Sequence, residues 1–186
     1  MNENCLTLKK TVVLVGMMGS GKTAVGRVLA EKLGAPFLDS DHEIETAAAM
    51  SIAEIFERDG EAFFRDRESE VIRRLLKERI CILSTGGGAF LAERNRSLIS
   101  EFGVSVWLDA DLNLLWNRVK HKDTRPLLQT ANPKQTLTEI YEKRVPFYQQ
   151  ADLSVYARPE YAIEDMANAV LQCLKTRSDV LEVPHD

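Results

Sequence analysis

The chain has few cysteines and no long hydrophobic run, and both features exclude classes of protein. Its 186 residues include three cysteines, which are far apart and form no C-x-x-C pair, so neither a disulfide framework nor a zinc site is expected. No segment approaches the roughly 18 uninterrupted apolar residues of a membrane-spanning helix, and the first ten residues hold no apolar stretch of signal-peptide length. We therefore expect a cytoplasmic protein with no membrane partner.

The chain also lacks a surplus of positive charge. Its formal net charge is −4, which argues against a protein whose main partner is nucleic acid. The content of 45% hydrophobic and 28% charged residues is that of an ordinary globular protein, and the length fits a single domain over residues 1–186. Arginine outnumbers lysine, and arginine binds carboxylates and phosphates through two parallel hydrogen bonds. The local placement of arginine is therefore more informative about a ligand than the net charge.

Short apolar runs alternate along the chain with segments in which apolar residues recur at helical spacing. The runs predict strands at residues 11–15, 36–38, 80–83, 104–108 and 153–156. The helical spacing predicts helices at residues 22–33, 51–58, 61–79, 92–101, 111–120, 136–149 and 161–174. This alternation predicts one α/β domain of three layers, in which a central parallel sheet of about five strands has helices on both faces.

Two segments do not follow the alternation. Residues 121–133 are polar, contain two prolines and have little periodicity, which predicts a mobile loop or lid. Residues 177–186 carry no clear pattern, and we expect a loose tail there.

The turn after the first predicted strand has the pattern of a phosphate-binding loop. Residues 16–23, GMMGSGKT, match G-x-x-x-x-G-K-[ST] at every fixed position and lie between a predicted strand and a predicted helix. In such a turn, unpaired N–H groups at the helix N-terminus bind phosphate, the lysine reaches the β- and γ-phosphates, and the hydroxyl is offered to Mg²⁺. Residues 11–34 are therefore predicted to be a phosphate-binding strand, loop and helix. The predicted nucleotide contacts are Gly19, Ser20, Gly21, Lys22, Thr23 and Ala24.

Two carboxylates follow the second predicted strand. Asp39 and Asp41 lie where α/β sheets bind their ligands, and residues two apart in an extended segment share a face. One carboxylate could hold Mg²⁺ through water, and the other could accept a proton from an attacking hydroxyl. An aspartate pair at this position is also common as a turn or a helix cap, so both interpretations are open.

Six motifs, in order and at similar spacing, resemble those of shikimate kinases. They are residues 16–23 (GMMGSGKT), 37–41 (FLDSD), 64–65 (FR), 86–88 (GGG), 124–128 (TRPLL) and 144–148 (RVPFY). The phosphate-binding loop is shared with many proteins, but the other motifs together are specific to this family. The resemblance runs from about residue 11 to residue 174. It implies a P-loop fold like that of nucleoside monophosphate kinases, with a substrate-binding segment at about residues 41–79.

The resemblance implies that the protein transfers the γ-phosphoryl group of ATP to the 3-hydroxyl of shikimate, in the synthesis of chorismate and the aromatic amino acids. Mg²⁺ would be the cofactor, and we expect a monomer. By position, shikimate would bind to Asp41, Arg65, Gly87 and Arg144. The chemistry agrees, because a ring with one carboxylate and three hydroxyls calls for arginine at the carboxylate and for an aspartate and a backbone amide at the hydroxyls.

The resemblance also assigns roles in catalysis and nucleotide binding. Asp41 is the candidate base, and Asp39 resembles the carboxylate that orients Mg²⁺ through water, with Thr23 as the other metal ligand. Arg125 in the predicted lid would bind the ATP phosphates, and Lys22, Asp41 and Arg125 would be the catalytic set. Arg118 resembles the arginine that stacks on adenine. Arg158 is expected to flank the same ring, although an arginine before proline is also an ordinary turn.

Two other functions remain open from the sequence. One is another small-metabolite P-loop kinase, acting on gluconate or on a nucleoside monophosphate. The other is a P-loop protein that uses a nucleotide to change partners. The absence of the guanine-specifying N-K-x-D pattern argues against a GTPase.

Overall fold

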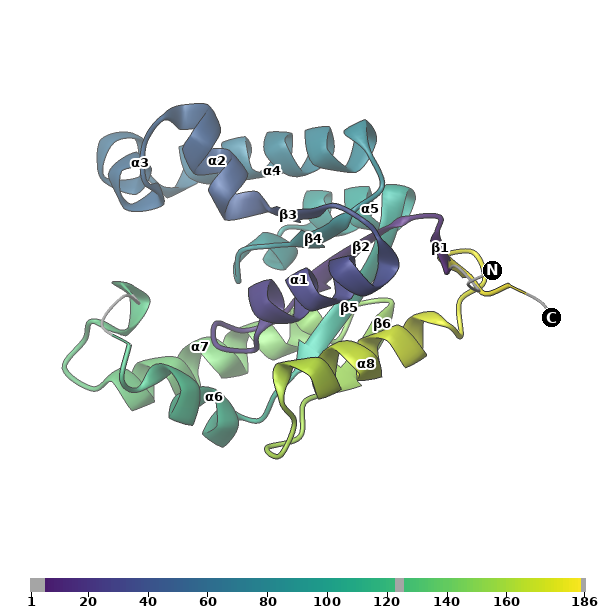
Figure 1. Cartoon of the computed structure of the whole chain (residues 1–186). Coiled ribbons are helices and arrows are strands. Elements are labelled where there is room, and N and C mark those ends of the chain that lie inside the picture. The colour runs from purple at the N-terminus through teal and green to yellow at the C-terminus, as the bar shows by residue number, and fades with distance from the viewer. Residues whose placement is uncertain (1–5, 123–125, 185–186) are drawn as a thin grey trace.

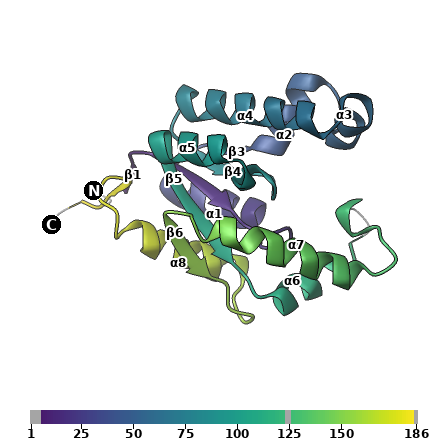
Figure 2. The same ribbon diagram turned by 180° about the vertical axis from the view of Figure 1, so that it is seen from behind.

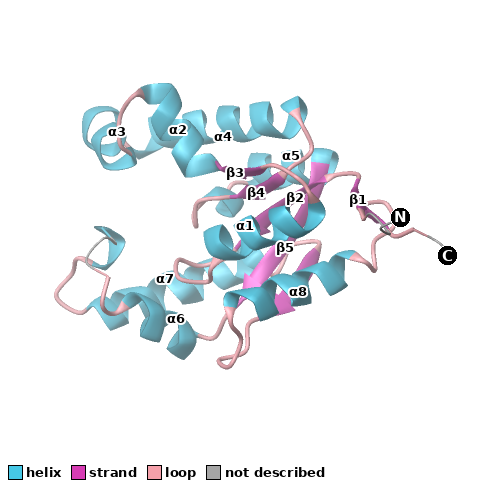
Figure 3. Cartoon of the chain, viewed as in Figure 1, coloured by secondary structure: helices cyan, strands magenta, loops and turns pink. Residues whose placement is uncertain are grey.

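A five-stranded parallel sheet forms the centre of the molecule (Figures 1 and 3). The structure is a computed structural model that describes residues 6–122 and 126–184. Every pairing in this sheet is parallel. The strand order is β3-β4-β2-β5-β6, and the strands are β2 (Thr11–Val15), β3 (Phe37–Asp39), β4 (Ile82–Ser84), β5 (Gly103–Asp109) and β6 (Leu153–Tyr156). The predicted α/β fold is confirmed, and each predicted strand is present, with small shifts of its ends.

Helices cover both faces of this sheet. One face packs against α1 (Lys22–Leu33) and α8 (Ile163–Leu174), and the other against α5 (Glu93–Phe102) and α7 (Pro133–Tyr148) (Figures 1 and 2). All five residues of β2 are buried, as expected of a strand covered on both faces. The side chains of the three layers form one continuous apolar core.

Three helices lie next to the edge strand β3. They are α2 (Ser40–Ala48), α3 (Ile52–Asp59) and α4 (Glu61–Glu78), and Ile44, Ile55 and Phe64 form a small core between them. Helix α3 begins with a capping box in which Ser51 and Glu54 exchange hydrogen bonds, as the sequence predicts. Helix α2 was not expected from the sequence, because its nine residues are mostly polar and bury only Ser40 and Ile44.

The segment predicted as a lid follows α6 (Leu112–Val119). Its described part contains the short 3₁₀ helix η2 (Pro126–Leu128), while residues 123–125 lie outside the described residues. Helix α7 begins at Pro133, earlier than predicted, because the Asn132 side chain accepts a hydrogen bond from the N–H of Gln135 and proline suits the first helical turn. Movement of this segment remains a prediction.

The end of the chain is more ordered than the sequence indicates. Strand β7 (Leu181–Glu182) pairs antiparallel with β1 (Thr7–Leu8), and Val180 and Leu181 are buried. Part of the expected loose tail therefore forms a strand, and the looseness of the tail remains a prediction. The partner strand lies at the other end of the chain, so the tail's own sequence does not reveal the pairing.

Across residues 6–122 and 126–184, no helix is both long and apolar enough to span a bilayer.

Candidate active site

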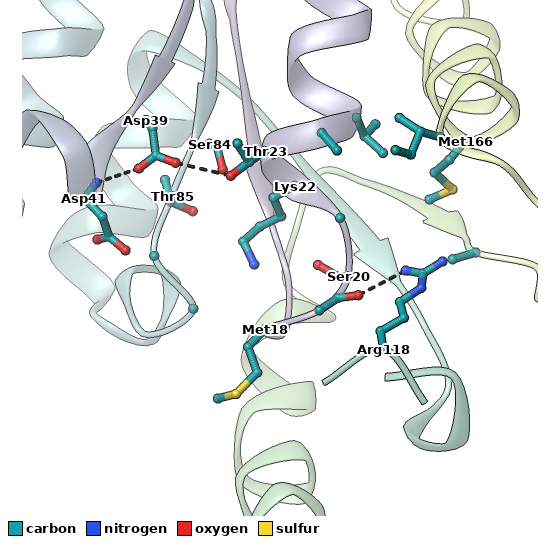
Figure 4. Close-up of a pocket in the computed structure, with 18 of the residues that line it drawn as sticks. Met18, Ser20, Lys22, Thr23, Asp39, Asp41, Ser84, Thr85, Arg118 and Met166 are labelled. Atoms are coloured by element: carbon teal, nitrogen blue, oxygen red, sulfur yellow. Dashed lines mark hydrogen bonds between the residues drawn. The ribbon is translucent and has the colours of Figure 1, made fainter. Parts of the chain in front are cut away.

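A cleft of about 780 Å³ opens at the carboxyl ends of β2, β3 and β4. This is the edge at which parallel sheets bind their ligands, and the volume is typical of a small-molecule site. Figure 4 shows that Lys22, Thr23, Asp39 and Asp41 lie around the same space, with Arg118 on the other side. All six residues predicted to contact the nucleotide, from Gly19 to Ala24, line this cleft.

The phosphate-binding loop joins the end of β2 to the start of α1. Gly19 and Gly21 have φ angles of +80° and +91°, which residues with a side chain rarely adopt. A Cβ on Gly19 would also lie 2.7 Å from Val119 Cγ1. Among the described residues, no side chain caps the N-terminus of α1, and the N-terminus of a helix favours an anion.

The ammonium of Lys22 lies inside this loop. It donates hydrogen bonds to the carbonyl oxygens of Gly16, at 2.8 Å, and Met17, at 2.9 Å. The side chain is thus held against the turn whose N–H groups would surround a phosphate.

Asp39 acts both as a helix cap and as a partner of the phosphate-binding loop. Its Oδ1 accepts hydrogen bonds from the N–H groups of Asp41, at 3.0 Å, and His42, at 3.2 Å, at the start of α2. Its Oδ2 accepts a hydrogen bond from Thr23 Oγ1 at 3.3 Å. The helix-cap interpretation that the sequence left open is therefore confirmed for this residue, and its role at a metal ion remains a prediction.

The Thr23 and Asp39 oxygens have the chemistry of a magnesium site. Mg²⁺ takes few protein oxygens beside phosphate and keeps several waters, and these two oxygens face an open cleft next to the phosphate-binding loop. In the part of the chain that the structure describes, no group of three or more His, Cys, Asp or Glu side chains could hold a metal. A nucleotide-bound Mg²⁺ needs no such group.

Asp41 reaches the cleft from a different backbone conformation than expected. The sequence predicts an extended segment that would place Asp39 and Asp41 on one face, but Asp41 lies in the first turn of α2. Both side chains nevertheless line the cleft. Burial, with the negative charges of Asp39 and Glu68, raises the pKa of Asp41 to about 6, and the charge of Lys22 only partly opposes this.

The three glycines after β4 each lie against one charged side chain. A Cβ on Gly86 would be 2.7 Å from Asp41 Oδ1, and one on Gly87 would be 2.7 Å from Arg144 Nη1. A Cβ on Gly88 would be 2.5 Å from Arg65 Nη2. Any side chain at these positions would displace one of the three groups. The structure thus brings Asp41, Arg65 and Arg144, which are far apart in sequence, to one glycine turn.

Arg65 is held by a buried carboxylate that the sequence analysis missed. Glu68 is 1% exposed, and its Oε1 accepts a hydrogen bond from Arg65 Nη1 at 2.8 Å. Burial raises the pKa of Glu68, while the charges of Arg65 and Arg144 oppose the rise. Glu68 follows Arg65 by three residues on a predicted helix, and this spacing, which places the two side chains on one face, is the signal that the sequence offers.

The three arginines predicted to contact the nucleotide differ in where they lie relative to the cleft. Arg118 lines the cleft and donates a hydrogen bond from Nη1 to the Gly19 carbonyl at 3.0 Å, and burial lowers its pKa. Arg158 does not line the cleft; its guanidinium lies over the ring of Tyr161, 5.8 Å from the centroid. Arg125 lies outside the described residues.

The far wall of the cleft is apolar and was not anticipated from the sequence. Tyr161, Ile163 and Met166, from the start of α8 and the loop before it, line the cleft together with Arg118. Flat apolar surface next to an arginine suits a planar ring. The periodicity of residues 161–174 predicts the helix but not which of its side chains face a ligand.

Comparisons with known proteins identify the family. The shikimate kinase family model matches residues 18–175. The shikimate kinase of Ruegeria pomeroyi is 69% identical over 176 residues, which are 95% of this chain and 90% of that protein. The shikimate kinase of Cereibacter sphaeroides is 63% identical over 94% of this chain and 87% of its own length.

Solved structures agree with this assignment. The shikimate kinase from Acinetobacter baumannii in complex with shikimate has a TM-score of 0.84 and 40% identity, over 90% of this chain and 93% of that chain. A gluconokinase from Sinorhizobium meliloti has a TM-score of 0.61 at 19% identity, which shows a shared fold alone. The predicted P-loop kinase fold and the predicted family are therefore confirmed, and this chain belongs to the shikimate kinase family.

Proposed function

We propose that this chain transfers the γ-phosphoryl group of ATP to the 3-hydroxyl of shikimate, giving shikimate 3-phosphate and ADP in the synthesis of chorismate and the aromatic amino acids. One observation carries the proposal. Asp41, Arg65 and Arg144 meet at the glycine turn, and this turn lines the same cleft as the phosphate-binding loop. The residues that line the cleft include groups for a triphosphate together with Asp41 and Gly87. Arg65 and Arg144 lie beside this lining, against the glycine turn, as groups for a small carboxylate.

In the nucleotide half of the cleft, the N–H groups of residues 19–24 would bind the phosphates, and Lys22 would turn from its two carbonyl partners to the β- and γ-phosphates. Arg118, with the apolar wall of α8, would hold the adenine. Arg158 would act on that ring through its contact with Tyr161. Arg125 is proposed to reach the phosphates from the predicted lid.

Thr23 and Asp39 would hold Mg²⁺. Their oxygens share a hydrogen bond beside the phosphate-binding loop, and Asp39 is fixed by its two backbone N–H donors. When bound, the ion supplies positive charge next to the transferred phosphoryl group.

In the acceptor half, Arg65 and Arg144 would bind the carboxylate of shikimate, and the Gly87 N–H would donate to a ring hydroxyl. Glu68 fixes the Arg65 guanidinium by accepting one of its hydrogen bonds. The arginine therefore keeps its other N–H groups in place for a bidentate pair with the carboxylate.

Asp41 would accept the proton of the 3-hydroxyl. Its pKa of about 6 leaves it ionised at neutral pH and makes it a stronger base than an ordinary aspartate. As the hydroxyl oxygen bonds to the γ-phosphorus, the bond from that phosphorus to the oxygen of ADP breaks and the proton moves to Asp41. Because phosphoryl transfer is loose, the charge near the transferred group from Lys22 matters more than early deprotonation.

An ADP-release assay tests the proposal with shikimate, gluconate and AMP as separate acceptors. Of the three acceptors, only shikimate should cause release of ADP, and mass spectrometry should find one added phosphoryl group on shikimate. Release with gluconate or AMP but not with shikimate would overturn it. A monomeric, cytoplasmic enzyme without membrane or nucleic-acid partners remains a prediction, and sedimentation analysis would test the monomer.

A further inference from the structure

Tyr148, at the C-terminal end of α7, is buried beneath the glycine turn. The whole residue is 0% exposed, and its hydroxyl donates a hydrogen bond to the carbonyl oxygen of Gly87 at 2.5 Å. The proposed reaction assigns no role to this hydroxyl. A buried polar group with a single short bond into a substrate-binding turn calls for an explanation.

The rest of the turn is held from other elements. The N–H of Ala89 donates to the Gly86 carbonyl at 3.1 Å. Ala89 begins the 3₁₀ helix η1 (Ala89–Leu91), and the buried Asn95 of α5 donates from Nδ2 to the Ala89 carbonyl at 2.8 Å. Arg96 of α5 donates to the carbonyls of Phe90 and Leu91, at 2.8 Å each. The turn is therefore fixed after Gly88 by α5, and at Gly87 by Tyr148 of α7.

Because peptide groups are planar, these hydrogen bonds fix the direction of the Gly87 amide. In a trans peptide the carbonyl and the following N–H point in opposite directions. The bond from Ala89 therefore orients the Gly86–Gly87 peptide, which carries the Gly87 N–H, and the bond from Tyr148 orients the next peptide. Since glycine otherwise adopts many backbone conformations, two oriented peptides leave Gly87 little freedom.

Arg144 belongs to the same arrangement. It lies one turn before Tyr148 on α7, so both side chains are on one face of the helix, and its Nη1 lies next to Gly87. Burial raises the pKa of the Tyr148 phenol, and the nearby positive charge of Arg144 only partly opposes the rise. The phenol is therefore protonated at neutral pH and has its one proton to donate to Gly87.

We propose that Tyr148 is a positioning residue for the acceptor substrate, holding the Gly87 carbonyl by a hydrogen bond at the point where the turn meets the Arg144 guanidinium. The inference rests on the proposed function, in which the Gly87 N–H and Arg144 bind shikimate. Without the hydroxyl, Gly87 loses the bond that orients its carbonyl. The turn beside Arg144 then has to be ordered when shikimate binds, and this costs affinity.

The test is the Tyr148→Phe variant, which keeps the ring and removes one oxygen. We expect the KM for shikimate to rise roughly 5–50-fold, while the KM for ATP and kcat stay within about threefold of wild type. Direct calorimetric binding of shikimate should weaken by a similar factor. The matched control is Tyr141→Phe on the same helix, whose half-buried phenol lies near Asp109 and Asp111 instead; both KM values should be unchanged.

A purely structural role for Tyr148 predicts a different result. Folded Tyr148→Phe with a wild-type KM for shikimate would overturn the inference, as would equal increases of the KM for shikimate and for ATP. Hydrogen exchange supplies a readout that needs no turnover: amides of the turn at residues 85–91 should exchange faster in Tyr148→Phe, while those of β2 keep their rates. Unchanged exchange in the turn would also contradict the inference.

The Arg144→Lys variant separates this inference from the proposed function. If Arg144→Lys raises the KM for shikimate and Tyr148→Phe does not, the positioning role is wrong and the acceptor clamp stands. If neither variant changes the KM for shikimate, the clamp is wrong and the positioning role falls with it.

Discussion

The two halves of the cleft are built in different ways. The nucleotide half comes mainly from one continuous segment, residues 19–24, whose conformation depends on a glycine turn and the start of a helix. The proposed acceptor half takes Asp41 from α2, Arg65 from α4, Gly87 from the turn after β4 and Arg144 from α7. A local motif can therefore hold a phosphate, whereas the proposed recognition of a small ring would depend on the packing of four elements.

The two halves also differ in how their charges are balanced. Lys22 is held by neutral carbonyl oxygens, which a phosphate can replace. Arg65 is held by the buried carboxylate of Glu68, and the glycine turn lies between Arg65, Arg144 and Asp41. Changes in the acceptor half should therefore affect substrate specificity and stability together, while changes in the nucleotide half should mainly affect the rate.

The largest effect is expected from Lys22→Ala. It removes the positive charge that the phosphate-binding motif assigns to the β- and γ-phosphates, and kcat should fall roughly 10²–10³-fold. Lys22 is not part of the buried core, so the melting temperature should be nearly unchanged. The matched control is Lys32→Ala at the other end of α1, where the ammonium pairs with Glu164 at the surface. Near-normal kcat in folded Lys22→Ala would refute the assignment of the phosphate-binding loop.

Arg65→Ala tests the acceptor half alone. Loss of a charged hydrogen bond to the substrate carboxylate should lower kcat/KM for shikimate roughly 10–150-fold, with the KM for ATP nearly unchanged. Arg67→Ala on the same helix is the control, because Arg67 is exposed and pairs with Glu70. An equal fall in kcat/KM for shikimate and for ATP would show that the two halves of the cleft are not independent.

Removing Arg65 also leaves the Glu68 carboxylate buried without its main partner. Such a loss is strongly destabilising. The double variant Arg65→Ala with Glu68→Gln should therefore recover stability without recovering kcat/KM for shikimate. Recovery of both would assign Arg65 a structural role only.

The pH dependence should report on Asp41. Its raised pKa of about 6 means that the carboxylate is protonated below that pH and cannot accept the hydroxyl proton. We expect kcat/KM for shikimate to fall about tenfold per pH unit below pH 6 and to level off above it. In Asp41→Asn, kcat/KM for shikimate should be much lower than in the wild type and should not fall further below pH 6. The same limb in Asp41→Asn would assign the titration to another group.

The smallest effect is a gain in stability for Asp41→Asn. A carboxyl whose pKa is raised on folding binds more protons in the native than in the unfolded state between about pH 4 and pH 6, so stability is lost as pH rises through this window. Replacing the charge should raise the free energy of unfolding at pH 7 by about 1–3 kcal/mol. At pH 4 the difference should vanish. Glu43→Gln in the same helical turn is the control. A matching gain in the free energy of unfolding in Glu43→Gln would show that the gain in Asp41→Asn does not come from the burial of Asp41.

Much of the fold could be predicted because its signals are local. The buried run at residues 11–15, the phosphate-binding loop and the capping box at Ser51 each depend on neighbours within a few residues. The unexpected features depend on distant contacts. Helix α2 is mostly polar and is stabilised by its cap on Asp39 and by the packing of Ile44, and β7 forms because β1 lies beside it.

The sequence by itself determined the phosphate-binding loop at residues 16–23, since such a loop needs only a helix N-terminus, glycines and a lysine in order. It also predicted the acceptor residues through family resemblance. Only the tertiary structure decided their environment: the burial that raises the pKa of Asp41, the glycines that admit Arg65 and Arg144, and the bonds from Glu68 and Tyr148. The physical reason is that burial, close approach and charge pairing are properties of neighbours in space, which local sequence patterns do not encode.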